Sequence, residues 1–262
     1  MPKNTLILGL AAGYHYGDVR PFLASLDHTG YCGDLVLFVS DTTRDLDRIT
    51  THPVATVPIQ RTAEQKNVPY NGLRYFAYLR YLESSKKYDK ILITDVRDVI
   101  FQRNPFSFPW PRGLNCTLED RSATIGGCPY NRHWVREHLG TEMLGELKDK
   151  PVACSGTTIG DHSAMVDYLR DMTRLLTPPP KAERMAGYDQ AIHNMLVHTG
   201  RIDSLTLFDN TGPILTLGQT QGEPATDTMG NVLNDAGNPA HIVHQYDRKP
   251  TLFRTIRKAF VS

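Results

Sequence analysis

Apolar positions follow a strand–helix–strand order through the first part of the chain. Residues 6–10 and 35–39 are short, almost uninterrupted apolar runs, which predicts buried strands. A helix is expected between them from Asp18, and a shorter strand at 54–59. Apolar side chains then recur on one side of residues 71–82, which predicts a second helix. Continuous apolar strands that alternate with helices indicate an α/β fold with a mostly parallel sheet.

The second part of the chain has a less regular pattern. The elements that we expect are a strand at 152–154 that runs into Ser155 and Gly156, a helix at 163–176 stopped by prolines at 178–180, and a helix at 188–198. Short apolar pieces separated by Gly, Asn and Asp predict hairpins and loops over 215–243. Residues 113–150 and 218–239 show no pattern of their own and are expected to form loops.

Basic and apolar residues alternate in the tail from Lys249 onwards. Such a segment can lie on an anionic membrane or an acidic partner. A C-terminal helix packed against the sheet is the simpler interpretation. Weak membrane association through this tail is kept as the alternative.

The charge balance excludes one large class of function. Lys plus Arg number 29 and Asp plus Glu number 28 among the 262 residues, which gives a formal charge of +1. A dedicated nucleic-acid binder carries a basic footprint, so no nucleic-acid partner is expected.

No apolar run approaches the roughly 20 residues of a membrane span. The short apolar run near the N-terminus is better explained as a first strand than as a signal peptide, and a cytoplasmic location is expected.

Two carboxylates stand where a buried strand ends. Asp95 and Asp98 follow the apolar run at 91–94, and Val99 resumes that run. Ligands of open α/β sheets bind at the carboxyl ends of the strands. Paired carboxylates there suit a divalent cation, which usually also holds phosphates. The plainer interpretation is one solvated aspartate and one aspartate paired with Arg97. A Gly-x-Gly-x-x-Gly motif and a phosphate loop are both absent from the sequence, so neither a dinucleotide enzyme nor a phosphate-loop ATPase is indicated.

Five segments together resemble a known family. Residues 95–98, Asp-Val-Arg-Asp, resemble the carboxylate motif of GT-A-fold glycosyltransferases, and most of all that of the glycogenin-like nucleotide-sugar transferases. The helix at 71–82, Cys-Ser-Gly-Thr-Thr-Ile-Gly at 154–160, Tyr-Asp-Gln-Ala-Ile-His-Asn at 188–194 and His-Gln-Tyr-Asp-Arg-Lys-Pro within 242–250 are similar to further segments of that family, in the same order.

The resemblance implies a single GT-A (Rossmann-like) domain over 1–262. Its nucleotide-sugar half would cover about 1–106, and a smaller acceptor half about 107–262. The implied reaction moves a sugar from a nucleotide diphosphate donor, typically UDP-linked in this family, to an acceptor that can be a glycan, a lipid or a protein. The comparison leans towards retention of configuration. The loops at 113–150 and 218–239 would then shape the acceptor side.

The resemblance also implies site residues. The implied ligands of Mn²⁺ or Mg²⁺ are Asp95, Asp98 and His244, of which the imidazole favours manganese. The implied donor contacts are Arg74 and Lys249 on the diphosphate and Ser155, Gly156, Asp189 and Gln190 on the sugar, with Asp189 as the candidate catalytic residue.

Some of these residues have plainer roles open to them. Asp189 can be a helix N-cap, His244 a structural histidine and Arg74 a solvated surface arginine. From their places after the first two strands, Tyr14 could stack on a nucleobase and Asp41 could reach the base or ribose. An aromatic residue at the place of Tyr14 more often closes the core.

Two departures from the family pattern affect the metal site. The usual motif is Asp-x-Asp, and Arg97 occupies its third position here. In a regular strand Asp95 and Asp98 would point to opposite faces, so a turn is needed for both to reach one cation. Cys154 stands where a polar residue is common, which leaves the sugar contact to Ser155 and the Gly156 backbone.

Two other functions compete with a glycosyltransferase. A non-catalytic sugar- or nucleotide-binding protein of the same fold would account for Arg97 in place of a carboxylate. A nucleotidyl- or phosphotransferase would use the same metal edge, but it would need a Gly-rich basic loop after the first strand. Residues 11–16 are poor in both features.

Overall fold

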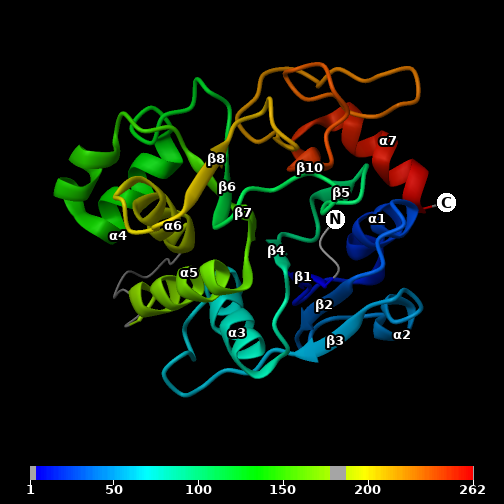
Figure 1. Cartoon of the computed structure of the whole chain (residues 1–262), viewed down its shortest axis with the longest axis horizontal. Coiled ribbons are helices and arrows are strands. Elements are labelled where there is room, and N and C mark those ends of the chain that lie inside the picture. Colours follow the sequence, from blue (N-terminus) through cyan, green and yellow to red (C-terminus); the bar gives the residue numbers. More distant parts are fainter. Residues whose placement is uncertain (1–3, 178–186, 262) are drawn as a thin grey trace.

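A seven-stranded sheet forms the centre of the protein. The computed structural model describes residues 4–177 and 187–261, and its main sheet has the order β3-β2-β1-β4-β7-β6-β8 (Figure 1). Its strands are β1 (Thr5–Leu10), β2 (Asp34–Val39), β3 (Ala55–Pro58), β4 (Lys90–Thr94), β6 (Leu114–Leu118), β7 (Ala153–Gly160) and β8 (Leu205–Phe208). Only β7 runs antiparallel to its neighbours β4 and β6 in this sheet. The expected α/β class with a mostly parallel sheet is therefore confirmed.

A second, three-stranded sheet lies beside the first. It consists of β5 (Val99–Phe101), β10 (Ile242–His244) and β9 (Ile214–Thr216), in that order. β10 pairs antiparallel with β5 and parallel with β9. Because β5 follows β4 after a four-residue connection, the chain passes from one sheet to the other at Asp95–Asp98.

Helices cover both faces of the main sheet. They are α1 (Tyr16–His28), α2 (Leu46–Ile49), α3 (Tyr70–Ser84), α4 (Pro129–Leu147), α5 (His162–Leu175), α6 (Tyr188–His198) and α7 (Pro250–Val261), with a 3₁₀ turn at Tyr246–Arg248. Leu6 and Leu8 of β1 face the core under α3, α5 and α6, and Ile7 between them faces the core under α1. This alternation explains why the strands are apolar throughout: both of their faces are buried.

The expectation of loops over 113–150 is wrong. This stretch contains β6 and the long helix α4. Most of α4 is solvent-facing, with only Asn131, Val135 and Leu147 buried, and Gly140 interrupts it at φ 89°. These two features remove the apolar periodicity by which a helix is recognised in sequence. Within 215–243, the short strand β9 and the start of β10 accompany the expected loops.

Two further expectations differ from the structure in their extent. The strand expected at 152–154 continues to Gly160 as β7. The helix expected from Asp18 begins at Tyr16, and Asp18 accepts a hydrogen bond from the His15 N–H in its first turn. The prolines at 178–180, which were expected to stop α5, lie outside the described residues.

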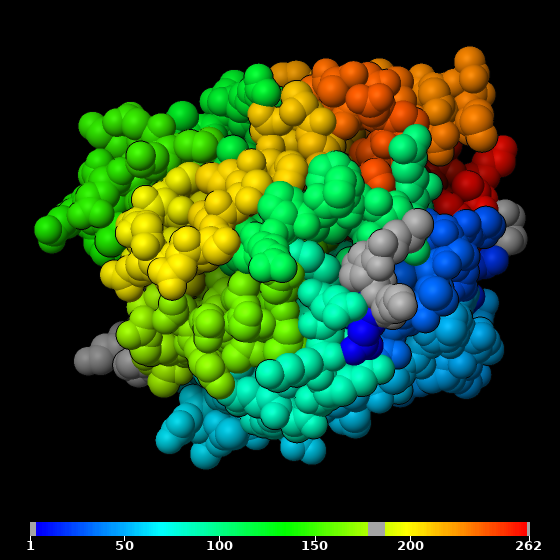
Figure 2. Space-filling view, in the orientation of Figure 1, coloured from blue at the N-terminus to red at the C-terminus, as the bar shows by residue number. Residues whose placement is uncertain are grey.

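The C-terminal tail forms the helix α7 against α1. Leu252 and Ile256 are buried in a small cluster with β9 and β10, and Arg257 donates a hydrogen bond to the Gly17 carbonyl of α1. The red and blue segments touch in Figures 1 and 2. The apolar side of the tail thus packs on the protein itself. None of the helices within 4–177 and 187–261 has the length and apolar character of a membrane span.

One buried hydroxyl joins α1 to the second sheet. Ser25 Oγ accepts a hydrogen bond of 3.0 Å from the Phe101 N–H, and Ser25 is fully buried. We expect Ser25→Ala to lower the free energy of unfolding by about 1–3 kcal/mol, because it leaves that N–H without a partner. Urea denaturation measures the change.

Ser84→Ala is the matched control for this prediction. The Ser84 hydroxyl bonds only carbonyls of its own helix, at an exposed position. Its change should stay within about 0.5 kcal/mol. Equal effects of the two substitutions would contradict the role of Ser25.

Candidate functional site

The predicted carboxylates lie on the connection between the two sheets. β4 ends at Thr94, residues 96–98 form a bend and turn, and β5 begins at Val99. In a regular strand Asp95 and Asp98 would point to opposite faces, and this turn allows both side chains to reach one place. His244 is the last residue of β10 and pairs directly with Val99. The antiparallel pairing of β5 and β10 therefore brings His244 to the turn.

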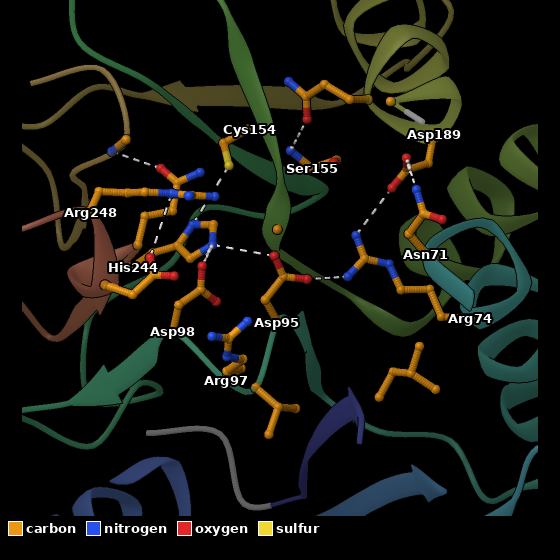
Figure 3. A pocket seen from close by; sticks show the side chains of 18 of the residues that line it. Asn71, Arg74, Asp95, Arg97, Asp98, Cys154, Ser155, Asp189, His244 and Arg248 are labelled. Atoms are coloured by element: carbon orange, nitrogen blue, oxygen red, sulfur yellow. Dashed lines mark hydrogen bonds and ion pairs between the residues drawn. The ribbon is translucent and has the colours of Figure 1, made fainter. Parts of the chain in front are cut away.

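The three side chains form one cluster, drawn in Figure 3. One ligand atom from each of Asp95, Asp98 and His244 lies within 4.8 Å of the others. His244 Nε2 is 3.4 Å from Asp95 Oδ2 and 3.8 Å from Asp98 Oδ2. The other ring nitrogen, Nδ1, lies 3.6 Å from the Cys154 sulfur. The imidazole is thus held between a thiol on one side and two carboxylates on the other.

Arg74 joins this cluster to Asp189. Its guanidinium is an ion-pair partner of Asp95 and lies 3.4 Å from Asp189 Oδ2. Asn71, one turn earlier in α3, donates a 2.7 Å hydrogen bond to the other Asp189 oxygen. Arg74 is buried rather than a solvated surface residue, and Asp189 lies inside the first turn of α6, whose N-cap is Gly187. Both plainer interpretations are therefore excluded.

The antiparallel strand β7 delivers its first residues to the same place. Thr157 pairs with Thr94, and the Gly156 carbonyl accepts a 2.8 Å hydrogen bond from the Asp95 N–H. The Ser155 N–H donates to Gln190 Oε1 at 3.0 Å, which links β7 to α6. Because β7 is antiparallel to β4, its beginning rather than its end meets the carboxyl end of β4.

Burial and opposite charge set the protonation of the cluster. Burial alone would raise the pKa of Asp95, but Arg74 and His244 outweigh it and hold that pKa well below its usual range. Burial raises the pKa of Asp98 to about 6; His244 opposes this rise and the Asp95 charge adds to it. Burial disfavours the charged imidazole, yet Cys154 and the two carboxylates raise the pKa of His244 well above its usual value.

The donor set fits a divalent cation. His244 Nε2 is buried and has no hydrogen-bond partner among the described residues. Two carboxylates and one imidazole are a donor set that suits Mn²⁺ or Mg²⁺. A Cβ atom on Gly156 would lie 2.3 Å from His244 Cε1 and 2.6 Å from Asp95 Oδ2. The glycine therefore keeps open the space beside His244 and Asp95.

A cavity of about 880 Å³ surrounds these residues. Of the predicted site residues, those that line it are Tyr14, Arg74, Asp95, Asp98, Ser155, Gly156, Asp189, Gln190 and His244. Asp41 and Lys249 do not line it. Asp41 is exposed, and the Lys249 amine donates to the Thr220 carbonyl at 2.6 Å. Their roles at a donor stay predictions.

Sequence reasoning missed several residues that line this cavity. They are Tyr70, Asn71, Arg97, Glu119, Tyr130, Asn131, Trp134, Gln219, Gln245, Asp247 and Arg248, beside smaller or apolar neighbours. Arg97 and Arg248 are exposed cations at the cluster (Figure 3). Arg248 was within a segment already singled out. Tyr130 and Trp134 lie in the stretch that was expected to form loops. Their spacing of four residues, which puts two side chains on one side of a helix, is the signal that could have identified them.

Gly156→Ala tests the space beside the cluster. The added methyl would collide with His244 and Asp95, so we expect Mn²⁺ affinity to fall at least about tenfold. Isothermal titration calorimetry measures it. Gly145→Ala is the matched control, because a Cβ there meets nothing within 4 Å, and it should leave Mn²⁺ binding unchanged. Equal Mn²⁺ binding by wild type and both variants would contradict this use of the cluster.

The pKa shifts predict a pH dependence of cation binding. Asp98 titrates near pH 6 and His244 above its usual value, and the protonated forms of both compete with a cation. Asp98 gains its proton as the pH falls through about 6, so Mn²⁺ affinity should decrease from about pH 7.5 to about pH 5.5. Calorimetry in buffers of different ionisation enthalpy should show proton release on binding. A constant affinity without proton release would contradict these assignments.

The chain has the fold of a solved protein of different sequence. No protein-family model and no curated protein sequence matches it. A crystal structure of an active-site mutant of LgtC matches it at a TM-score of 0.59 and 12% sequence identity, covering 98% of this chain and 96% of that chain. This likeness does not single out the glycogenin-like members. Together with the sheet order and the helices on both faces, it shows that the protein has a GT-A-like, Rossmann-like fold.

Proposed function

We propose that this protein is a metal-dependent glycosyltransferase that moves a sugar from a nucleotide diphosphate donor, most suitably a UDP-sugar, to an acceptor hydroxyl. The observation that carries the proposal is the convergence of Asp95, Asp98 and His244 beside Arg74 and Asp189 in one cavity. The cavity volume is within the range of small-molecule sites. The structural neighbour LgtC is a glycosyltransferase, which supports this class of reaction.

Charge stabilisation is the chemistry that such a site would supply. Breaking a sugar–diphosphate bond leaves negative charge on the departing diphosphate. A Mn²⁺ or Mg²⁺ ion held by Asp95, Asp98 and His244 would neutralise that charge. Arg97 and Arg248 are the exposed cations of the cavity wall and would meet the outer phosphate oxygens. Arg74 has its guanidinium on Asp95 and Asp189, so its role here is to hold these carboxylates in place.

Asp189 is the proposed catalytic residue on the sugar side. Asn71 and Arg74 bond its two oxygens, so the carboxylate has a fixed direction. Ser155, Gly156 and Gln190 complete the same wall and would contact sugar hydroxyls. In a transfer that retains configuration, the acceptor attacks the face from which the diphosphate leaves. A fixed carboxylate on that wall would then stabilise the positive charge that develops on the sugar.

The two competing functions have less support. The case for a non-catalytic binder was Arg97 in place of a carboxylate. The turn at residues 96–98 brings Asp98 to the cluster instead, which removes that reason. A nucleotidyltransferase would need a basic, glycine-rich loop after β1, and residues 11–16 hold one glycine and no Lys or Arg.

Thermal melting with UDP and Mn²⁺ tests the donor site. At a hundredfold excess over the dissociation constant, ligands that bind the native state should raise Tm by roughly 5–10 °C in a chain of this size. Asp95→Asn should abolish the shift, because it removes a donor group and the partner of Arg74. Hydrolysis of a panel of UDP-sugars then separates an enzyme from a binder.

Asp167→Asn is the control for this experiment. Asp167 forms an exposed surface ion pair with Arg170 and lies outside the cavity, so the Tm shift should persist in this variant. If no nucleotide diphosphate shifts the wild-type Tm with Mn²⁺ present, the proposed function is wrong.

A further inference from the structure

Two aromatic side chains stand on α4 at one end of the cavity. Tyr130 and Trp134 are four residues apart and both line it, with ring centroids 6.0 Å apart and planes inclined at 38°. Tyr130 is 69% exposed, whereas every other Phe, Tyr and Trp among residues 4–177 and 187–260 is buried or partly buried. A large exposed aromatic beside a ligand cavity points to a binding surface. We call Tyr130 and Trp134 the aromatic platform.

The aromatic platform is fixed to the sugar side of the site. The Trp134 ring lies against Gly187, where a Cβ atom would be 2.0 Å from a ring carbon. Gly187 is the N-cap of α6, the helix that carries Asp189 and Gln190. Asn131, between the two aromatic residues, is buried, and its side-chain oxygen accepts a 3.4 Å hydrogen bond from Gln190. The platform therefore holds a set position relative to Asp189.

The sheet order places the platform away from the nucleotide end. Tyr14 follows β1, on one side of β4 and its Asp95. α4 follows β6 and contacts α6, on the other side of β4 beyond β7 (Figure 1). A nucleotide on the β1 side with its diphosphate at Asp95 leaves the far side of the cavity for the acceptor. This step rests on the proposed function.

A buried carboxylate lines the same cavity as the rings. Glu119 lines the same cavity directly after β6, is only 6% exposed, and its Oε2 has no hydrogen-bond partner among the described residues. A buried acceptor without a partner is costly unless a ligand donates to it. A pyranose offers what this combination needs, because its C–H face is attracted to the negative face of an aromatic ring and its hydroxyl rim donates hydrogen bonds.

We propose that the aromatic platform is the acceptor subsite and that the acceptor is itself a sugar. A pyranose ring lies on Tyr130 and Trp134 and directs a hydroxyl to Glu119. An alkyl chain would leave the Glu119 oxygen without a donor, and a serine or threonine side chain has no ring face to lie on the two aromatic rings. The acceptor class is therefore a glycan rather than a lipid alcohol or a protein side chain.

The two tryptophans of the chain allow a direct test. Trp110→Phe removes the buried one and leaves Trp134 as the fluorescent reporter. In this background we expect lactose, maltose or cellobiose to change the emission of Trp134 saturably. Each sugar is titrated alone and with UDP and Mn²⁺. Tyr130→Ala should raise the dissociation constant about tenfold, which corresponds to the free energy of one aromatic contact. Tyr130→Phe should restore the wild-type value.

Met229→Ala is the matched control. Met229 is the most exposed large apolar side chain of the described residues and lies outside the cavity, so sugar binding should be unchanged. The inference is overturned if none of the three sugars binds in either condition, or if Tyr130→Ala binds them like wild type. It is also overturned if the serine peptide Gly-Ser-Gly or octanol saturates the signal and the sugars do not.

The Tm shift and the sugar titration, measured on the same protein, distinguish a failure of this inference from a failure of the proposed function. A Tm shift with UDP and Mn²⁺ but no sugar titration contradicts the acceptor subsite alone. A saturable sugar titration with no nucleotide shift contradicts the glycosyltransferase and leaves a sugar-binding platform.

Discussion

Neutralisation of crowded carboxylates is the constraint on which this site depends. Asp95, Asp98 and Asp189 line one cavity, and like charges that are close together and partly removed from bulk water repel strongly. Arg74 pairs with Asp95 and Asp189, and His244 faces Asp95 and Asp98. The helix α3, the turn after β4 and the pairing of β5 with β10 each serve to bring one of these charges to the others.

The parts of the fold that could be predicted are those buried on two faces. β1, β2 and β4 have apolar side chains on both sides of the sheet, which gives continuous runs in the sequence. α5 was recognisable because one side of it is buried, and α6 because almost all of its side chains are buried. The cluster of Asp95, Asp98 and His244 came from the resemblance to a family. Periodicity alone opposed it, because the turn at residues 96–98 leaves no hydrophobic signature.

The parts that could not be predicted depend on contacts between distant segments. Arg74 is one residue off the apolar stripe of α3, and only the positions of Asp95 and Asp189 explain its burial. α4 has few buried positions and is broken by Gly140, so its sequence resembles a loop. The strands of the second sheet are three residues long, too short for a period to appear.

The separation of α4 from the sheet edge has an evolutionary consequence. The groups proposed for the donor come mainly from the ends of β1, β4 and β10 and from the start of β7, each fixed by strand pairing. The aromatic platform comes from the first turns of a mostly exposed helix, which tolerates replacement of its surface residues. Under the proposed function, descendants of this protein would change acceptor by exchanging a few positions of one helix, while the sheet and its charges remain as they are.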